Sequence, residues 1–486
     1  MNTIELYEKD IERKNSGILR TQLGKVIIVF AIFTILFFPL NNMWFICMTI
    51  FTMLLLSILT IKIQSVKEFY NPIILLVLIN FIMFGFAAIY VIVYPEEFYR
   101  YNIDLDILSN GMLHILLCFC ALIYGYYTAG RNKFISYYLE KIRVKIPSLS
   151  NYYISNVLGA VLVFEIIGWI SRYLIIQLGR YFFLPAIQTE LITEYAGIMM
   201  LINIGSQLPI FAVALIFISY LTKGGKKYLI PFLLFIIVEI AYYLPTGSKE
   251  QIFFPFFIIL VIFSIIRGTP KKTVVVAGFI AVFLIFPLTG IYRYTFVSLE
   301  SVKDLPILLS LYLDYMKNLD FEVLFFNIFG VRLNSAAIVS VLVDKTPEIW
   351  NFQLGLTYLF FFISFVPRLI WPGKPVDQTV IRFGVDYNLN APEDIKTANA
   401  VTWIGETFLN FGWLGFIAAF FIGILYRFIY NFFLSSRKVS NLSLLMFSAA
   451  LYMMIRGDQL AGQFAGLLQL YIVLIFLLLP FLKRIR

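Results

Sequence analysis

Two fixed cations lie close together in the segment Val366–Pro375, which reads VPRLIWPGKP. Its prolines rule out a continuous helix and push each preceding residue towards extended backbone. The segment therefore predicts a rigid loop that presents Arg368, Trp371 and Lys374. A guanidinium group binds phosphate oxygens through a planar fork, and an ammonium group supplies a point charge. Together they suit a pyrophosphate, and Trp371 is either an interfacial anchor or a platform on which a sugar ring stacks.

A carboxylate follows in Ala400–Gly415, which reads AVTWIGETFLNFGWLG. Glu406 lies at the head of an apolar helix, and Asn410 comes one turn later on the same face. Partial desolvation at the outer mouth of a membrane helix disfavours the ionised carboxylate and so makes it a stronger general base. The structural alternative is that Glu406 pairs with an arginine of the preceding polar segment.

Other ionisable residues are less specific candidates. Arg293 and Arg332 add positive charge to that polar segment. Lys249 lies in the tight turn PTGSKEQ, where it either completes a binding site or caps two helices. Arg172 lies two turns after Glu165 inside an apolar run, and ionisable residues at such depth are functional candidates by default. For any one of these charges, the alternative is pairing with another charge or exposure to water.

The composition decides the class of protein. Of the 486 residues, 61% are hydrophobic and 14% are charged, whereas soluble domains are nearer 45–50% apolar. Apolar runs of about 20 residues recur, as a hydrocarbon core about 30 Å thick requires. The net charge of +10 fits the cytoplasmic Lys/Arg bias of membrane proteins better than nucleic-acid binding. His114 and the three cysteines lie within apolar runs without metal-ligand spacing, so neither a metal site nor a cofactor is predicted.

The apolar runs predict an all-α polytopic membrane protein with about twelve transmembrane helices. They fall at about 26–40, 43–61, 71–93, 110–128, 152–177, 196–221, 228–244, 252–267, 273–292, 411–434, 443–455 and 463–482. Basic turns put both termini, and the turns at 130–150, 223–227, 267–272 and 437–438, in the cytoplasm. The turns at 94–109, 245–251 and 456–458 then face outside, together with the whole of 293–410.

Three regions follow from this topology. Residues 1–292 form an N-terminal bundle of about nine helices, 293–410 a large extracytoplasmic loop, and 411–486 the C-terminal helices. Within the loop, Leu356–Ile370 is apolar but only about fifteen residues long, too short for a span. It is predicted to be re-entrant or interfacial. Helical spacing of apolar residues within 301–350 predicts short amphipathic helices on the membrane face.

Several of these motifs together resemble one family. PRLIWPGKP, followed by GETFLNFGWLG at the head of a helix, resembles the Wzy-type oligosaccharide repeat-unit polymerases of bacterial O-antigen and capsule synthesis. The turn PTGSKE is similar to that family's Thr-Gly-Ser before a basic residue, with Lys249 where arginine is more frequent. Many helices and one large, late external loop are similar too.

The resemblance implies an integral membrane glycosyltransferase of GT-C-like helical architecture. It would join repeat units carried on undecaprenyl pyrophosphate, at the outer face of the bacterial cytoplasmic membrane. Arg368, Arg293 and Lys374 would stabilise the departing lipid pyrophosphate, and Glu406 would accept the proton of the attacking hydroxyl. Sugar and pyrophosphate contacts would come from Trp371, Lys249, Arg332, Asn410 and Arg172. The expected partners are the lipid-linked glycan, the bilayer, and a chain-length regulator and a flippase of the same pathway.

Two alternatives remain open. An O-antigen ligase uses the same donor, but such ligases are expected to carry a histidine in the large external loop, where this chain has none. A polysaccharide or lipid-linked oligosaccharide transporter would carry charges along a transmembrane path, for which Glu165, Arg172 and Glu239 are candidates. A transporter does not account for the large late loop.

Overall fold

The computed structural model describes residues 42–64, 68, 70–95, 103–131, 141, 152–178, 196–246, 249–271, 273, 278, 310, 314, 317, 334–375, 378–390, 401–434 and 439–484. Its first half comprises α2 (Asn42–Gln64), α3 (Pro72–Asn80), the π-helix η2 (Phe81–Phe86), α4 (Ala87–Val93), α5 (Leu105–Arg131), β1 (Tyr152–Ile154), α7 (Val157–Gln177), α9 (Ala196–Lys223), α10 (Lys226–Tyr243), the 3₁₀ turn η5 (Leu244–Thr246) and α11 (Lys249–Arg267). Its second half comprises α15 (Ser335–Lys345), α16 (Leu356–Phe365), α17 (Gln378–Asp386), α18 (Thr402–Phe411), the 3₁₀ turn η8 (Gly412–Leu414), α19 (Gly415–Leu434), α20 (Asn441–Arg456), α21 (Leu460–Leu478), the 3₁₀ turn η9 (Leu479–Phe481) and β2 (Leu482–Arg484).

The prediction of an all-α polytopic membrane protein agrees with this architecture. Within the described residues, 8 helical segments are long and apolar enough to cross a membrane. They are Asn42–Gln64, Pro72–Val93, Leu105–Gly130, Val157–Gln177, Ile198–Lys223, Glu250–Arg267, Thr402–Leu434 and Leu460–Phe481. Two more predicted spans are present as helices, α10 and the 16-residue α20. The run at 26–40 lies outside the described residues, as does the run at 273–292 apart from residues 273 and 278.

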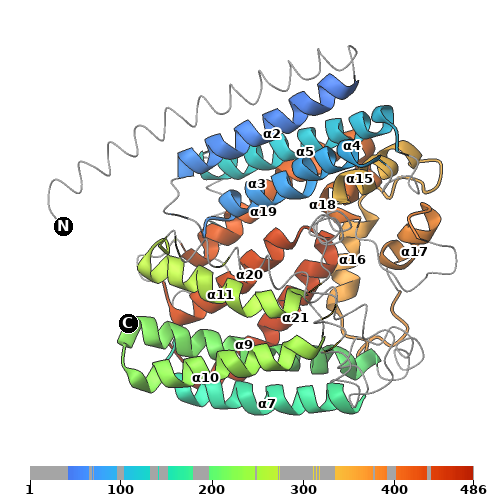
Figure 1. The fold of residues 1–486 in the computed structure, drawn as a ribbon. Coiled ribbons are helices and arrows are strands. Elements are labelled where there is room, and N and C mark those ends of the chain that lie inside the picture. Colours follow the sequence, from blue (N-terminus) through green and yellow to red (C-terminus); the bar gives the residue numbers. More distant parts are fainter. Residues whose placement is uncertain are drawn as a thin grey trace, which may run out of the picture.

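The helices form one bundle with two sides. Helices α2, α5 and α19 lie together on one side, and α7, α9 and α10 lie on the other, with α20 and α21 between them (Figure 1). Glycines allow the closest crossings: a Cβ added to Gly423 would lie 2.2 Å from the carbonyl oxygen of Leu122 on α5. One added to Gly168 would lie 2.3 Å from the Pro209 ring on α9. Small residues at such crossings let membrane helices approach backbone to backbone.

Contacts between distant turns test the predicted alternation of the helices. At one end of the bundle, β1 pairs antiparallel with β2, beside the last residues of the chain. Asn441, which begins α20, donates a 3.0 Å hydrogen bond to the Ile154 carbonyl of β1. Arg267, which ends α11, donates to the Leu221 carbonyl near the end of α9. These strands and helix ends belong to the turns assigned to the cytoplasm.

The opposite end gathers turns assigned to the outside. Arg456 at the end of α20 forms a 2.9 Å ion pair with Glu250 at the start of α11. The Trp403 amide of α18 donates to the Gly457 carbonyl. The side-chain amide of Asn42, at the start of α2, donates to the Asp106 carboxylate at the start of α5. The structure therefore sorts these turns into the same two groups as the charge pattern.

Helix α15 corrects one expectation about the large loop. Short helices within 301–350 were expected on the membrane face, but residues 335–343 of α15 are all buried. The helix packs between α5 and α18, and a Cβ added to Gly111 of α5 would lie 2.1 Å from Ser340 Oγ. Part of the segment predicted as an external loop is thus core. Helix α17, which lies beyond 301–350, is amphipathic, with Phe383 buried and Arg382 exposed.

The helix predicted at 411–434 also begins earlier than expected. Helix α18 starts at Thr402, and the chain then passes through η8 into α19. Gly412 has φ +56°, a conformation that side chains with a Cβ rarely adopt, and it separates the two helices. The motif Ala400–Gly415 is thus mostly helix and is not a loop before a helix.

Candidate functional site

Helix α16 packs along α21 at the edge of the bundle, with Thr357 as its one buried residue, and stops part-way along α21. At its start, Thr357 Oγ1 donates to Glu406 Oε1 over 2.8 Å, and Glu406 Oε2 accepts from the Leu460 amide that begins α21. At its end, Gln469 Nε2 of α21 donates to the Ser364 carbonyl over 2.8 Å. The two helices therefore run side by side in the same direction. The nine helical steps from Leu460 to Gln469 correspond to roughly 14 Å, less than half of a hydrocarbon core about 30 Å thick.

This geometry agrees with the expectation that Leu356–Ile370 is too short to span the membrane. The 10-residue helix α16 extends for about 15 Å, too short to cross the hydrocarbon core. It ends at Phe365 because Pro367 cannot continue it. Val366–Pro375 then forms turns, so the loop with the two cations lies at the depth of Gln469 along α21.

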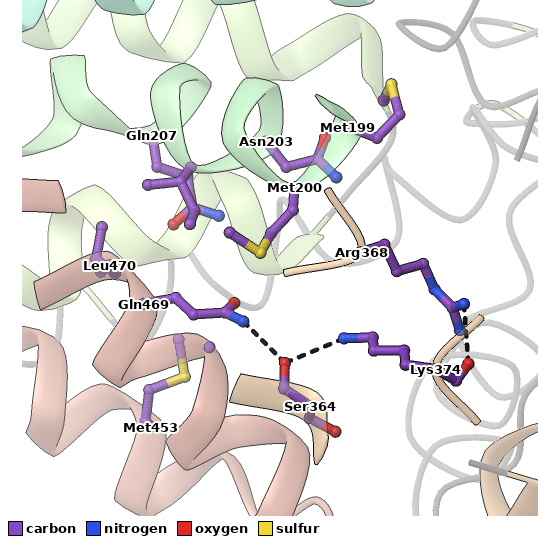
Figure 2. A pocket seen from close by; sticks show the side chains of 12 residues that line it. Met199, Met200, Asn203, Gln207, Ser364, Arg368, Lys374, Met453, Gln469 and Leu470 are labelled. Carbon is purple, nitrogen blue, oxygen red and sulfur yellow. Dashed lines mark hydrogen bonds between the residues drawn. The ribbon is translucent and has the colours of Figure 1, made fainter. Parts of the chain in front are cut away.

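A pocket of about 470 Å³ lies beside the end of α16. Helices α9, α20 and α21 form its walls, and the basic loop contributes Arg368 and Lys374 (Figure 2). The full lining consists of Met199, Met200, Asn203, Ile204, Gln207, Ser364, Arg368, Lys374, Met453, Gly466, Gln469 and Leu470. Arg368 and Lys374 thus line the same pocket, while their predicted role in binding an anion stays a prediction. Trp371 is 43% exposed and is not part of the lining.

Main-chain carbonyls hold both cations in place. Arg368 Nη1 donates to the carbonyls of Lys374 and Pro372, over 3.0 and 3.2 Å. Lys374 Nζ donates to the carbonyls of Val366 and Ser364, over 2.9 and 3.2 Å. The hydrogen bonds from Lys374 satisfy carbonyl acceptors at the C-terminus of α16, where a positive charge is favourable. Figure 2 shows Lys374 and Gln469 meeting at the Ser364 carbonyl.

Keeping Lys374 positively charged at this site costs free energy, and a bound anion would reduce that cost. Burial lowers the pKa of Lys374, and the nearby Arg368 lowers it further. Both influences disfavour the charged ammonium group. A bound phosphate oxygen would oppose both, because it replaces lost solvation and neutralises the repulsion.

Glu406 is buried at a junction that connects the starts of α16 and α21 to α18, which corrects the expectation of a general base at the outer end of a membrane helix. Its side chain has 0% exposure, and its oxygens accept from Thr357 and Leu460 as described above. The prediction that Asn410 lies on the same face is correct, because Asn410 Nδ2 donates to the Glu406 carbonyl over 2.7 Å. Asn410 Oδ1 in turn accepts from the Gly355 amide. Neither Glu406 nor Asn410 lines the pocket; together they join the starts of α16 and α21 to α18.

Arg172 is also placed away from the cations of the pocket. Its guanidinium forms two parallel hydrogen bonds to Glu239 of α10, over 2.7 and 2.6 Å, and both side chains are buried. Arg172 Nε donates to the Ser206 carbonyl of α9, and its guanidinium carbon lies 4.0 Å from the centre of the Tyr242 ring. The predicted role in substrate binding is therefore replaced by a structural one that joins α7, α9 and α10.

The other predicted site residues cannot be placed at the pocket. Arg293 and Arg332 lie outside the described residues, and Lys249 is described only as the first residue of α11. Its neighbour Glu250 belongs to an exposed cluster in which Arg456 pairs with both Glu250 and Asp458. Where the structure describes the chain, no group of three or more His, Cys, Asp and Glu side chains is placed to hold a metal ion.

The pocket contains amides that inspection of the sequence missed. Asn203 and Gln207 lie one turn apart on α9, and Gln469 comes from α21. All three lie inside segments long and apolar enough to cross a membrane. The sequence contains a signal for them, because polar side chains are costly within such apolar segments and therefore indicate a functional or structural role. Only ionisable residues were singled out in those segments.

Comparisons with known proteins do not add a family. Searches against family models, curated proteins and solved structures find no match to this chain.

Proposed function

We propose that this protein polymerises undecaprenyl-pyrophosphate-linked oligosaccharide repeat units at the outer face of the bacterial cytoplasmic membrane. The observation that carries the proposal is the pocket beside α16, where Arg368 and Lys374 meet methionine and leucine side chains. Such a pocket suits a ligand with an anionic head and an apolar tail. The motif resemblance described above supports the same donor and a GT-C-like architecture.

In the proposed reaction, a hydroxyl of one repeat unit attacks the anomeric carbon of another. The bond from that carbon to the pyrophosphate oxygen breaks, the lipid pyrophosphate leaves with the electron pair, and the hydroxyl proton passes to an oxygen of the departing pyrophosphate. Arg368 stabilises the negative charge that develops on the leaving group, with Lys374 beside it. Glu406 is assigned a positioning role, because both of its oxygens already accept hydrogen bonds in the core. Arg293 stays a candidate for the leaving group.

Placement of the pocket on the outer side follows from the proposed orientation. With both termini cytoplasmic, the start of α16 lies at the outer end of the bundle and the loop descends from there. Flipped, lipid-carried repeat units reach that side, and a chain-length regulator and a flippase of the same pathway are the proposed partners.

The test is the lipid-linked glycan profile of cells that carry Arg368→Lys or Lys374→Gln, which preserve part of the loop's hydrogen bonding. Single repeat units should still be made and exported, while long chains are lost. Arg382→Ala is the matched control, because Arg382 is 63% exposed on α17 and does not line the pocket. Unchanged chain length in both pocket variants would remove the assigned role of the cations.

A lipid-linked oligosaccharide transporter is the second candidate, favoured by the depth of the pocket along α21. The lipid-linked glycans of the same variant cells distinguish a transporter from a polymerase. Loss of transport leaves single units on the inner leaflet, where a periplasmic glycan-modifying probe does not reach them. Loss of polymerisation leaves single units on the outer leaflet.

A further inference from the structure

The amides Asn203 and Gln207 face the pocket from within an apolar helix. Helix α9 has a mean hydropathy of 2.1 over its most apolar stretch, so two carboxamides one turn apart depart from its composition. Asn203 is exposed into this space and Gln207 is half-buried, and a polar side chain within a segment apolar enough to cross a membrane is costly unless it has a partner. Neither side chain hydrogen-bonds to a residue in the described part of the chain, although both line the cavity. Intrachain bonding thus does not account for them there.

The opposite wall offers a fixed acceptor. Gln469 Nε2 donates to the carbonyls of Ser364 and Phe365, over 2.8 and 2.9 Å. Because both partners are acceptors, the NH₂ group must face them, and Oε1 is left to accept a hydrogen bond. One turn earlier on α21, a Cβ added to Gly466 would have no heavy atom within 4 Å, so this part of the wall is open.

The arrangement divides the pocket by chemistry. Arg368 and Lys374 supply positive charge at the loop, whereas the amides are neutral and can both donate and accept. Hydroxyl and acetamido groups of a sugar present that mixture, and phosphate does not. The volume of about 470 Å³ falls within the range of small-ligand sites. Met199, Met200 and Met453 line the rest with flexible apolar surface.

We infer that Asn203, Gln207 and Oε1 of Gln469 form a subsite that recognises hydroxyl or acetamido groups of the pyrophosphate-linked sugar of the donor. This inference rests on the proposed function and adds specificity-determining residues to it. A bound sugar that lacks the matching groups covers these amides and leaves them unpaired, which is how hydrogen-bonding sites reject close analogues. The cations then bind every donor of this class, and the amides select among them.

The position of the amides on α9 depends on a second set of contacts. Pro209 has no N–H, so the carbonyl four residues earlier, that of Gly205, loses its helical donor. The next carbonyl, of Ser206, accepts from Arg172 Nε over 3.1 Å. Arg172 therefore fixes α9 between Asn203 and Gln207, and acts on the subsite as a positioning residue.

The test measures binding to the full-length protein in phosphatidylethanolamine nanodiscs. The probes are the lipid-linked glycan extracted from cells that use this protein, and undecaprenyl pyrophosphate without glycan. The variants Asn203→Leu and Gln207→Met keep approximate shape and remove the amides. Ser219→Ala is the control on the same helix, because Ser219 Oγ bonds only to the Leu215 carbonyl of its own helix among the described residues.

Each amide variant should weaken binding of the lipid-linked glycan about tenfold, the loss of roughly one hydrogen bond. Binding of undecaprenyl pyrophosphate should change less than twofold, and the control should change neither. Equal weakening for both probes, or no weakening for either, overturns the subsite. Wild-type protein that binds both probes equally also overturns it. Wild-type protein that binds neither probe overturns the proposed function as well.

Discussion

Replacing Arg172 by methionine should destabilise the protein more than replacing Arg172 and Glu239 together. The single substitution leaves a buried carboxylate without its partner, whereas the double substitution Arg172→Met, Glu239→Met leaves no buried charge of the pair. The structure supports a large effect, because the two side chains form parallel hydrogen bonds of 2.7 and 2.6 Å and have exposures of 0% and 2%.

The magnitude follows from what each variant leaves unpaired. Breaking a buried ion pair by removing one partner costs about 3–5 kcal/mol, while apolar replacement of both partners is often close to neutral. Both variants also lose the Arg172 bond to the Ser206 carbonyl, about 1 kcal/mol, and the cation–π contact with Tyr242, about 1–2 kcal/mol. The double variant should therefore be more stable than the single one by about 3 kcal/mol.

Labelling of the buried native cysteines measures unfolding. Cys118 and Cys120 lie buried on α5, so a thiol-reactive dye labels them when the fold opens, while Cys47 is exposed and is replaced by serine. With an unfolding entropy of about 2 cal/mol/K per residue, the 486-residue chain changes its midpoint by about 1 °C per kcal/mol. The expected gap between single and double variants is then about 3 °C. Ser219→Ala on α9 serves as the matched control.

One result would refute the reasoning. If Arg172→Met and the double variant unfold at the same midpoint, the carboxylate of Glu239 gains nothing from Arg172. The lost bond from Arg172 to the Ser206 carbonyl and the lost contact with Tyr242 would then account for the whole effect of the single substitution.

Three further outcomes are expected. Because the pKa of Lys374 is lowered from the ordinary lysine value of 10.5, Lys374 loses its proton at a lower pH than an ordinary lysine does, and pyrophosphate binding should weaken as the pH rises. Titrations of the protein with pyrophosphate at several pH values measure this, and Lys374→Arg should remove the pH dependence. Glu406→Leu leaves the Leu460 amide and the Thr357 hydroxyl without their acceptor and should cost about 1–3 kcal/mol for each; Glu406→Gln should cost less in the same dye assay, and equal loss would contradict the junction. A cysteine at the exposed Asn388, in a protein without native cysteines, should react with an impermeant maleimide on spheroplasts; labelling that requires permeabilised membranes would reverse the proposed orientation.

The sequence predicts the parts of this molecule that depend on length and charge. Leu356–Ile370 is too short to span, and α16 indeed stops beside Gln469. The charge pattern of the turns groups the helix ends correctly, as the pairing of β1 with β2 illustrates. Prolines predict the loop after α16 because their effect on the backbone is local.

Tertiary partners are what the sequence cannot supply. Glu406 looks like a solvent-facing base beside an apolar run, but its environment is set by Thr357 and Leu460, which come from distant segments. Arg172 has Glu165 as its nearest acid on the same helix, yet it pairs with Glu239 of α10. Helix α15 carries serines and a terminal charge, and only its packing against α5 and α18 makes it core.

The position of Lys374 follows from the physical problem of ending α16 part-way along α21. The last carbonyls of α16 have no helical donors, and at this depth along α21 solvent is a poor substitute. Lys374 and Gln469 provide donors to the carbonyls of Ser364, Phe365 and Val366. An anion that recruits Lys374 must compete with those acceptors, whereas Arg368 has further N–H groups beyond the one that holds the loop. In the proposed site Arg368 is therefore the primary anion-binding group, whereas the contacts of Lys374 first stabilise the C-terminus of α16.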